Sequence, residues 1–260
     1  MGHKRDYHIH TGLSNCANPA MTLGAIVREC ERLGLEEIGI ADHLYGIGPA
    51  PNANLRKEIE QLQSPLRVRL GIEAGFNGRL GTHPITVADK QKYGFDYAIG
   101  SHHSTYVKEH NLNRIIELQH EGHLKTCRHP AIDVLGHPWR FLYEEFRERG
   151  WPWFDTVTVV PKGLTRELGR VAKATGTAIE INATSNLCMK FNPPSYLVGY
   201  IDYLAILASE GVMFSLGSDA HELAELSTAS QTWEVVDQLG LTDDRIWHPG
   251  LQLKTISEGT

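Results

Sequence analysis

The chain has 260 residues, a formal net charge of −6 and 22% charged residues. This acidic balance, without a run of lysine and arginine, excludes the basic footprint of a nucleic-acid-binding protein, and no apolar run approaches the ~18 residues of a membrane span. The four cysteines are scattered without a C-x-x-C pair, as is typical of reduced thiols. We therefore expect a cytoplasmic protein with a single α/β domain over residues 1–260. The oligomeric state stays open.

The hydrophobic pattern alternates between predicted strands and predicted helices along the chain. The predicted strands cover residues 5–10, 37–41, 67–76, 95–100, 132–136, 178–182 and 212–217. The predicted helices cover residues 22–33, 55–62, 85–93, 111–125, 165–175, 196–209 and 231–239, the first of them between a Thr22 cap and a Gly34 terminator. About seven such alternations without a linker or a repeat favour a parallel α/β barrel. An aromatic-rich segment between Pro152 and Pro161 is interpreted as a surface excursion.

His8 and His10 form an H-x-H pair on the first predicted strand. Strand side chains alternate, so the two imidazoles should share one face while Tyr7 and Ile9 point into a core. Two such imidazoles can share a metal ion. In a chain with 14 histidines the pair alone is weak evidence, because it also arises by chance.

Side chains that can bind a metal recur at the ends of successive predicted strands, where we count eight nitrogen or oxygen donors. These are His8, His10, His43, Glu73, His103, His137, Asp219 and His221. The carboxyl ends of the strands of a parallel barrel open on one face. Each donor alone has an ordinary explanation, such as a hydrogen-bonded histidine or a helix cap. Together they would repel when charged and need cations to neutralise them, and a set of imidazoles and carboxylates suits zinc, manganese or iron.

The order and spacing of the motifs that carry these donors resemble the PHP (polymerase and histidinol phosphatase) superfamily. The motifs are His8-x-His10, Ala41-Asp42-His43, Gly71-Ile72-Glu73, Gly100-Ser101-x-His103, Gly136-His137-Pro138 and Gly217-Ser218-Asp219-Ala220-His221. The resemblance covers roughly residues 5–225. It implies a distorted (β/α)7 TIM-like barrel that holds two or three divalent metal ions at the C-terminal ends of its strands and hydrolyses phosphoesters.

Carried over residue by residue, the resemblance implies three groups of ligands. One metal would be bound by His8, His10, Glu73 and Asp219. Glu73 would bridge to a second metal, completed by His103 and His137. A third metal would be held by His43 and His221. His102, beside the ligand His103, occupies a position that is usually apolar in the family.

Two departures from the family pattern limit the inference. The third metal usually takes a further histidine about six residues past the H-x-H pair, where this chain has Cys16; a thiolate ligand and an ordinary free cysteine both stay open. In the histidinol phosphatase branch, Thr-Ser-Gly and an arginine follow the Glu-x-Asn strand. Here Glu180-Ile181-Asn182 is followed by Ala183-Thr184-Ser185-Asn186-Leu187, and the first basic residue is Lys190. This difference argues against histidinol phosphate as the substrate.

The expected reaction is hydrolysis of a small phosphorylated metabolite by a metal-bound hydroxide that attacks phosphorus, without a protein nucleophile. Arg140 is the first candidate to bind the phosphate, followed by Lys190 and Arg79. Trp139 would either stack on a ring-bearing leaving group or pack in the core. Asp42 and His221 would either move a proton to the leaving group or support the metals.

Other classes of function also fit the pattern. A metal-dependent hydrolase of a non-phosphate ester, lactone or amide would use similar metal chemistry, and a small phosphodiester is a further candidate substrate. A binding module in which metals serve only as staples is the non-enzymatic alternative. Specificity for the leaving group is expected in the loops at residues 45–54, 77–83 and 138–162.

Overall fold

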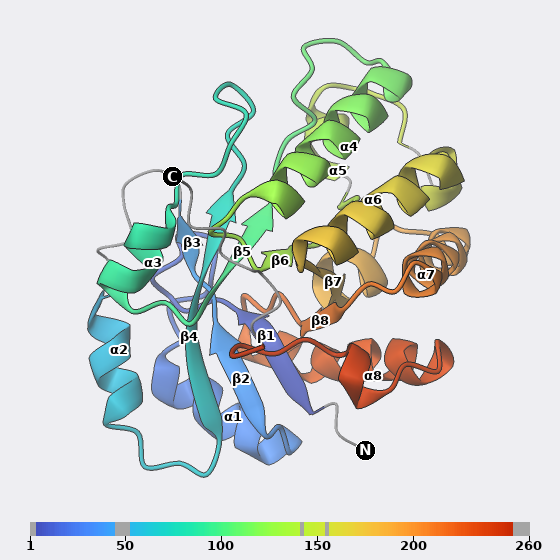
Figure 1. Ribbon diagram of the computed structural model, residues 1–260. Helices are drawn as coiled ribbons and strands as arrows, with labels where there is room; N and C mark the ends of the chain where they lie inside the picture. Colours follow the sequence, from blue (N-terminus) through green and yellow to red (C-terminus); the bar gives the residue numbers. More distant parts are fainter. Residues whose placement is uncertain (1–3, 45–52, 141–142, 154–155, 252–260) are drawn as a thin grey trace.

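A parallel β-sheet that curls into a barrel forms the centre of the computed structural model, which describes residues 4–44, 53–140, 143–153 and 156–251. The strand order is β1-β2-β4-β5-β6-β7-β8, and β3 pairs with β4 beside this path (Figure 1). The strands are β1 (Arg5–Ile9), β2 (Glu37–Ile40), β3 (His43–Leu44), β4 (Arg67–Gly75), β5 (Tyr97–Ser101), β6 (Val134–Leu135), β7 (Ala178–Asn182) and β8 (Phe214–Gly217). Every strand pair is parallel, so the carboxyl ends of the strands share one end of the barrel.

The barrel is nearly closed, because the first strand meets the chain that follows the last one. Ile9 forms a parallel bridge with Ala220. The Asp219 amide donates to the His8 carbonyl at 2.7 Å, and the His10 amide donates to the Ala220 carbonyl at 3.1 Å. The predicted TIM-like α/β barrel is confirmed, and its closure joins the two segments that carry the H-x-H pair and Asp219.

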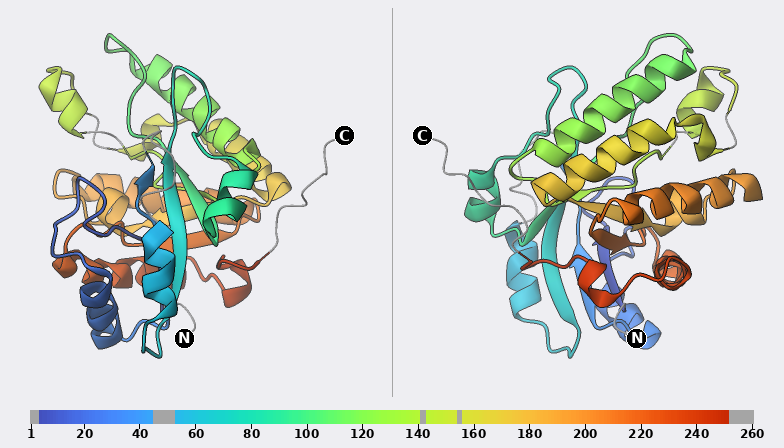
Figure 2. Two further views of the ribbon diagram at one scale, coloured as in Figure 1. Left: turned by 90° about the vertical axis from the view of Figure 1, so that its left-hand side faces the viewer. Right: turned by 45° about the vertical axis from the view of Figure 1, so that its right-hand side comes forward.

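Helices lie around the outside of the barrel (Figures 1 and 2). They are α1 (Leu23–Leu33), α2 (Ala53–Glu60), α3 (Val87–Tyr93), α4 (Leu112–Arg128), α5 (Tyr143–Glu148), α6 (Lys162–Thr175), α7 (Pro194–Ser209) and α8 (Ala229–Gln238). α1 begins where Thr22 accepts a hydrogen bond from the Ala25 amide and ends at Gly34 in the left-handed conformation, as predicted. Across the described part of the chain, no helix is long and apolar enough to cross a membrane.

Some predicted elements differ from the structure. β6 has only two residues instead of the five predicted over 132–136. The Asp133 backbone still bonds to Ala98 and Ala178 on the two neighbouring strands, and its carboxylate accepts from the Ala98 amide at 2.7 Å. The short strand β3 and helix α5 were not predicted; each is too short for a periodic pattern to define it. Of the expected specificity loops, residues 45–52, 141–142 and 154–155 lie outside the described residues.

The amino end of the barrel is filled by aromatic side chains. The Tyr97 hydroxyl donates to the Tyr7 carbonyl at 2.6 Å, and both rings make edge contacts with Trp247 at 5.7 Å. Gly39 and Gly71 make room for Tyr97, since a Cβ would lie 2.0 Å and 2.2 Å from its ring atoms. This packing closes the bottom of the barrel and leaves the opposite end for polar groups.

The alternation predicted for β1 is interrupted. The register of β1 with β2 shifts between Asp6 and Ile9, as in a β-bulge. Both predicted core residues are buried, but Tyr7 packs in the aromatic cluster of the barrel whereas Ile9 packs with the apolar face of α1. The imidazoles of His8 and His10 still lie side by side, with ring centroids 5.0 Å apart.

Candidate metal centre

The eight predicted donors lie together at the carboxyl end of the barrel. We call this set the metal-centre group: His8, His10, His43, Glu73, His103, His137, Asp219 and His221. Glu73 is fully buried at its centre, on β4. The neighbouring strands and the segments that follow them supply the other members, so the parallel topology alone gathers residues that are far apart in the sequence.

The two carboxylate oxygens of Glu73 face different histidines. Oε1 lies 3.2 Å from His103 Nε2 and 3.1 Å from His137 Nε2. Oε2 lies 2.5 Å from His43 Nδ1 and 3.6 Å from Nε2 of both His8 and His10. A carboxylate with this arrangement can bridge two cations.

A second carboxylate, Asp219, faces the H-x-H pair. Its Oδ1 lies 3.1 Å from His10 Nε2 and 3.6 Å from His8 Nε2. Donor atoms of these three residues lie within 4.8 Å of one another, close enough to hold one ion. The other oxygen of Asp219 accepts from the Ser185 hydroxyl at 2.5 Å, which fixes the carboxylate in place.

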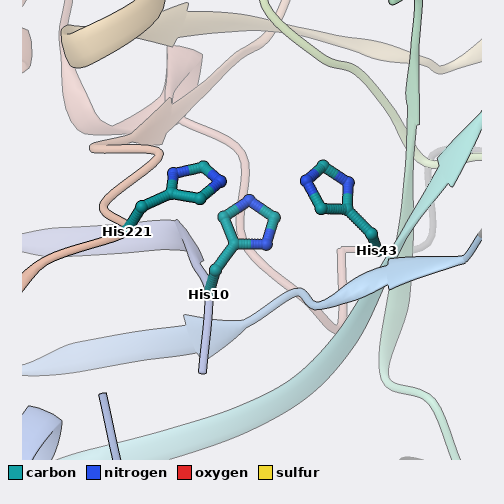
Figure 3. A group of neighbouring side chains, drawn as sticks. All are labelled: His10, His43 and His221. Atoms are coloured by element: carbon teal, nitrogen blue, oxygen red, sulfur yellow. The ribbon is translucent and has the colours of Figure 1, made fainter. Parts of the chain in front are cut away.

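His43 belongs to two possible ligand groups. One consists of His43, Glu73 and His103, and the other of His10, His43 and His221. Figure 3 shows the rings of the second group next to one another; the His10 centroid lies 4.2 Å from that of His221 and 4.4 Å from that of His43. The resemblance assigned His43 only to the third metal, whereas the geometry also places it against the bridging carboxylate.

Cys16 lies beside this last group. Its exposed thiol hydrogen-bonds the side chains of His43 and His221. Burial opposes ionisation, but these two histidines outweigh it and lower the pKa of Cys16 to about 6. The position therefore offers a sulfur donor next to two imidazoles.

Glu180 contacts two members of the metal-centre group, His8 and His137, and the sequence analysis gave it no role in the site. It is fully buried on β7; its Oε1 lies 2.7 Å from His8 Nδ1, and its Oε2 accepts from the His137 amide at 2.6 Å. Gly217 makes room for it, since a Cβ there would lie 2.2 Å from Oε1. When His8 Nδ1–H donates to this carboxylate, the lone pair on Nε2 points toward Glu73 and Asp219. The available signal was the acidic residue inside the apolar strand Ala178–Asn182, the same signal that singled out Glu73.

Asp42 and Ser14 orient His10 in a comparable way. Asp42 is buried and accepts three hydrogen bonds, from the Thr11 amide, the Thr11 hydroxyl and the Ser14 hydroxyl at 2.7–2.8 Å. Because Ser14 gives its proton to Asp42, its oxygen accepts from His10 Nδ1 at 3.3 Å. His10 Nε2, 3.1 Å from Asp219 Oδ1, is then the nitrogen that would face an ion held beside this carboxylate. For Asp42 we considered proton transfer to the leaving group and support of the metal ligands, and this geometry favours the supporting role.

Two members of the metal-centre group have strained backbones. Asp219 has φ +59° and His137 has φ +24°, in a region that side chains with a Cβ rarely adopt. Such strain persists only where the surrounding structure imposes it, and it concentrates at functional sites.

Electrostatics couple the carboxylates to the imidazoles. Burial raises the pKa of Glu73, but His43, His103 and His8 outweigh this and lower it well below the usual value. Burial lowers the pKa of His8, but Glu180, Asp219 and Glu73 together raise it well above the usual value. His10 has fewer favourable partners, so burial lowers its pKa to about 3.

The donor set fits divalent metal ions. The buried Nε2 of His8 has no hydrogen-bond partner within the described ranges, and its nearest carboxylate oxygens, on Glu73 and Asp219, lie 3.6 Å away. Unpaired polar atoms are costly in a protein interior. The imidazole nitrogens and carboxylate oxygens that converge here are the donors that a zinc-like ion takes, and the histidines would give up their protons when it binds.

The other residues predicted for the site lie in different surroundings. Arg140 follows His137, donates its amide to the His137 carbonyl at 3.0 Å, and has a buried Nε without a hydrogen-bond partner in the described chain. Lys190 and Arg79 are both exposed, and within the described residues neither side chain contacts the metal-centre group. Trp139 is 2% exposed and packs in the core, which favours the packing interpretation over stacking on a substrate.

Comparisons with known proteins agree with this geometry. The model of the PHP domain family matches residues 6–184. The chain is 26% identical over 246 residues to a probable phosphatase of Vibrio parahaemolyticus, covering 93% of this chain and 87% of that protein. It is 25% identical over 250 residues to a probable phosphatase of Thermoanaerobacter sp., covering 93% of this chain and 88% of the relative.

Among solved structures, the fold is similar to that of histidinol phosphate phosphatase from Lactococcus lactis, which was determined with zinc, L-histidinol and phosphate. The TM-score is 0.67 at 18% sequence identity, over 92% of this chain and 95% of the other. The likeness concerns the barrel as a whole.

Proposed function

The chain belongs to the PHP domain family, and on that premise we propose that it is a metal-dependent hydrolase of small phosphate esters. One observation carries the proposal: the carboxylate of Glu73 presents its two oxygens to separate sets of histidines inside a buried, donor-rich cluster. The phosphatase names of the relatives support the reaction class.

We assign the metal-binding role to the whole metal-centre group. Divalent ions held there would neutralise the phosphoryl oxygens and make water nucleophilic at neutral pH. Zinc is the ion that we propose, because the donors are mostly imidazoles and because the Lactococcus lactis phosphatase contains zinc. Two ions would fill the groups around Glu73 and Asp219. Cys16 with His43 and His221 would hold a third.

The side chains around the ligands perform separate tasks. Glu180 holds His8 in one tautomer and also fixes the backbone of His137. Ser14 and Asp42 do the same for His10. These contacts keep the lone pairs aimed at the ions, so little reorganisation is needed when substrate binds.

Arg140 is the residue that we propose binds the phosphoryl group. Besides burial, the positive charge of Arg140 contributes to the lowered pKa of His103, and its buried Nε lacks a hydrogen-bond partner among the described residues. A guanidinium can bind two phosphoryl oxygens in parallel. Lys190 is the second candidate; since it is exposed, it would have to reach toward the phosphate. Arg140→Ala should raise KM for phosphate esters about tenfold or more, and Lys190→Ala should have a smaller effect.

Turnover of phosphorylated metabolites by the zinc- or manganese-loaded enzyme tests the proposal. Glu73→Gln should lower kcat/KM by about 10³-fold or more, since several kcal/mol of charge stabilisation depend on the bridge. Glu121→Gln, an exposed residue of α4, is the matched control and should retain activity. Equal activity of wild type and Glu73→Gln would refute the phosphatase assignment. Faster turnover of carboxylic esters, lactones or amides than of phosphate esters would replace it with the alternative hydrolase.

A further inference from the structure

We infer that a hollow beside His103 is the subsite for the leaving group and that it selects phosphate esters of uncharged, largely apolar alcohols. The inference rests on the proposed function, because it assigns a substrate class to the same centre. The hollow has a volume of about 280 Å³ and is lined mainly by Leu44, Phe76, Pro84, His103, Ser104 and Tyr106. That volume suits a small ring rather than an extended group.

The hollow and the metal centre share one side chain, His103. The His103 ring lines the hollow, and its Nε2 lies 3.2 Å from the Glu73 carboxylate. A phosphoryl group that sits over the metal-centre group would therefore have its ester substituent within reach of the hollow.

The aromatic wall of the hollow is held rigidly. Phe76 stacks on the buried ring of His102, with centroids 4.4 Å apart at 25°. The Tyr106 hydroxyl lies 3.2 Å from Nδ1 of the same histidine, and the Tyr106 ring meets Phe76 edge-on at 5.8 Å. Gly78 leaves room for Tyr106, because a Cβ would lie 2.3 Å from its ring. A preformed wall binds a ring without a further ordering cost.

The chemistry of the lining indicates an uncharged ligand. Apart from the His103 imidazole, none of the lining residues, all of which belong to the described chain, is ionisable below pH 9: there is no aspartate, glutamate, lysine or arginine. The side-chain Oδ1 of Asn77 already accepts from the amides of Arg79 and Leu80 at 3.0 Å. An ammonium or carboxylate on the leaving group would lose hydration there without gaining a charged partner. An apolar ring would instead gain from burial against Phe76.

Three phosphate esters that differ in the charge of the leaving group test the inference: phenyl phosphate, phosphoethanolamine and phosphoglycolate. We expect the zinc-loaded wild type to prefer phenyl phosphate by about tenfold or more in kcat/KM. Phe76→Ala should reduce that preference by raising KM for phenyl phosphate, while inhibition by inorganic phosphate stays unchanged. Phe191→Ala, which changes an exposed aromatic residue outside the hollow, should leave the preference intact.

Ser104→Asp provides a test by gain of function. Ser104 Oγ accepts from the Tyr106 amide at 3.2 Å, and an aspartate can make the same bond, so the variant should fold. The added carboxylate should shift the ratio of kcat/KM values toward phosphoethanolamine by about tenfold. Unchanged ratios in both Phe76→Ala and Ser104→Asp, or an altered ratio in Phe191→Ala, would overturn the subsite while the phosphatase assignment stands. No turnover of any ester by the loaded wild type would overturn both.

Discussion

Two groups of buried or half-buried histidines lie next to each other in this barrel and differ in their partners. The first consists of the histidines of the metal-centre group. The second, which we call the neutral histidine group, consists of His83, His102 and His123. His102 of the neutral histidine group and His103 of the metal-centre group are adjacent residues just after β5, and their side chains point in different directions. His103 faces Glu73, whereas His102 packs against Phe76 and His123.

Hydroxyl and carbonyl groups, rather than carboxylates, surround the neutral histidine group. His83 Nδ1–H donates to the Ala74 carbonyl at 2.7 Å, and His83 Nε2 lies 2.8 Å from the Thr126 hydroxyl oxygen. His102 Nε2 lies 3.0 Å from the same oxygen, and the Tyr106 hydroxyl lies 3.2 Å from His102 Nδ1. None of these contacts involves an aspartate or a glutamate.

Carboxylates account for the difference between the groups. Burial lowers the pKa of His83 and His123 to about 3, and at His83 the charge of Glu73 opposes burial too weakly to restore it. At His43 burial acts in the same direction, but Glu73 outweighs it and raises the pKa to about 10. The comparison teaches that histidine content alone does not define a metal site. A shared buried carboxylate does.

The largest effect that separates the groups should come from His103→Ala. This change removes a donor that faces Glu73, so we expect loss of about one bound metal ion and a fall in kcat/KM of about 10²–10³-fold. Stability of the metal-free protein should change little, because His103 is partly exposed. Metal analysis by mass spectrometry and steady-state kinetics check this. Full metal content with full activity would remove His103 from the ligands.

Glu180→Gln makes the surroundings of His8 more like those of the neutral histidine group. The amide keeps the shape but removes the charge that holds Nδ1–H at 2.7 Å. We expect zinc affinity to fall by about 10–100-fold, as is typical of such supporting carboxylates. Titration with a competing chelator measures this. Unchanged affinity would show that Glu180 serves packing alone.

His102→Leu should destabilise the fold without removing metal. The change removes one hydrogen-bond partner from the Thr126 hydroxyl and one from the Tyr106 hydroxyl, which costs about 1–3 kcal/mol in the free energy of unfolding. Chemical denaturation and metal analysis should show lower stability at wild-type metal content. Loss of metal at unchanged stability would contradict the division into two groups.

A smaller effect concerns the pH dependence of stability. The folded state holds the pKa of His123 at about 3 because burial disfavours the charged ring, whereas the unfolded chain takes up the proton near pH 6.5. The unfolded state therefore binds more protons as pH falls below 6.5, and stability is lost between about pH 6.5 and 3.

His123→Leu removes the contribution of His123 to this loss of stability at low pH. Between pH 5.5 and 4.5 the free energy of unfolding of the metal-free variant should fall less steeply than that of wild type, by about 1.4 kcal/mol per pH unit. His110→Leu, at an exposed position, is the control. If the free energy of unfolding falls with pH at the same slope in wild type and in His123→Leu, His123 is protonated in the folded protein.

Much of the fold followed from the sequence because each strand–helix unit carries local signals, such as Thr22 and Gly34 around α1. The barrel could also be predicted, since parallel strands need helical crossovers. β3 and α5 could not, because two and six residues are too few for a period to appear. The register shift in β1 depends on pairing with β2, which the local sequence does not encode.

The candidate site was predictable where a donor ends a strand. Glu180 carries the same local signal as Glu73, but its role depends on a contact with His8 across 172 positions of the chain, which the local sequence does not encode. The dual environment of His43 depends on side-chain rotation rather than on order in the sequence. The motifs therefore identify which residues gather, and the three-dimensional structure is needed to group them.

Anomalous diffraction at the zinc absorption edge, from crystals of the zinc-loaded protein, tests the central claim most directly. We predict at least two peaks that share Glu73 as a ligand, each about 2.0–2.2 Å from a carboxylate oxygen and from imidazole nitrogens of the metal-centre group. Zinc peaks only at other places on an active enzyme, with none in contact with Glu73, would contradict it.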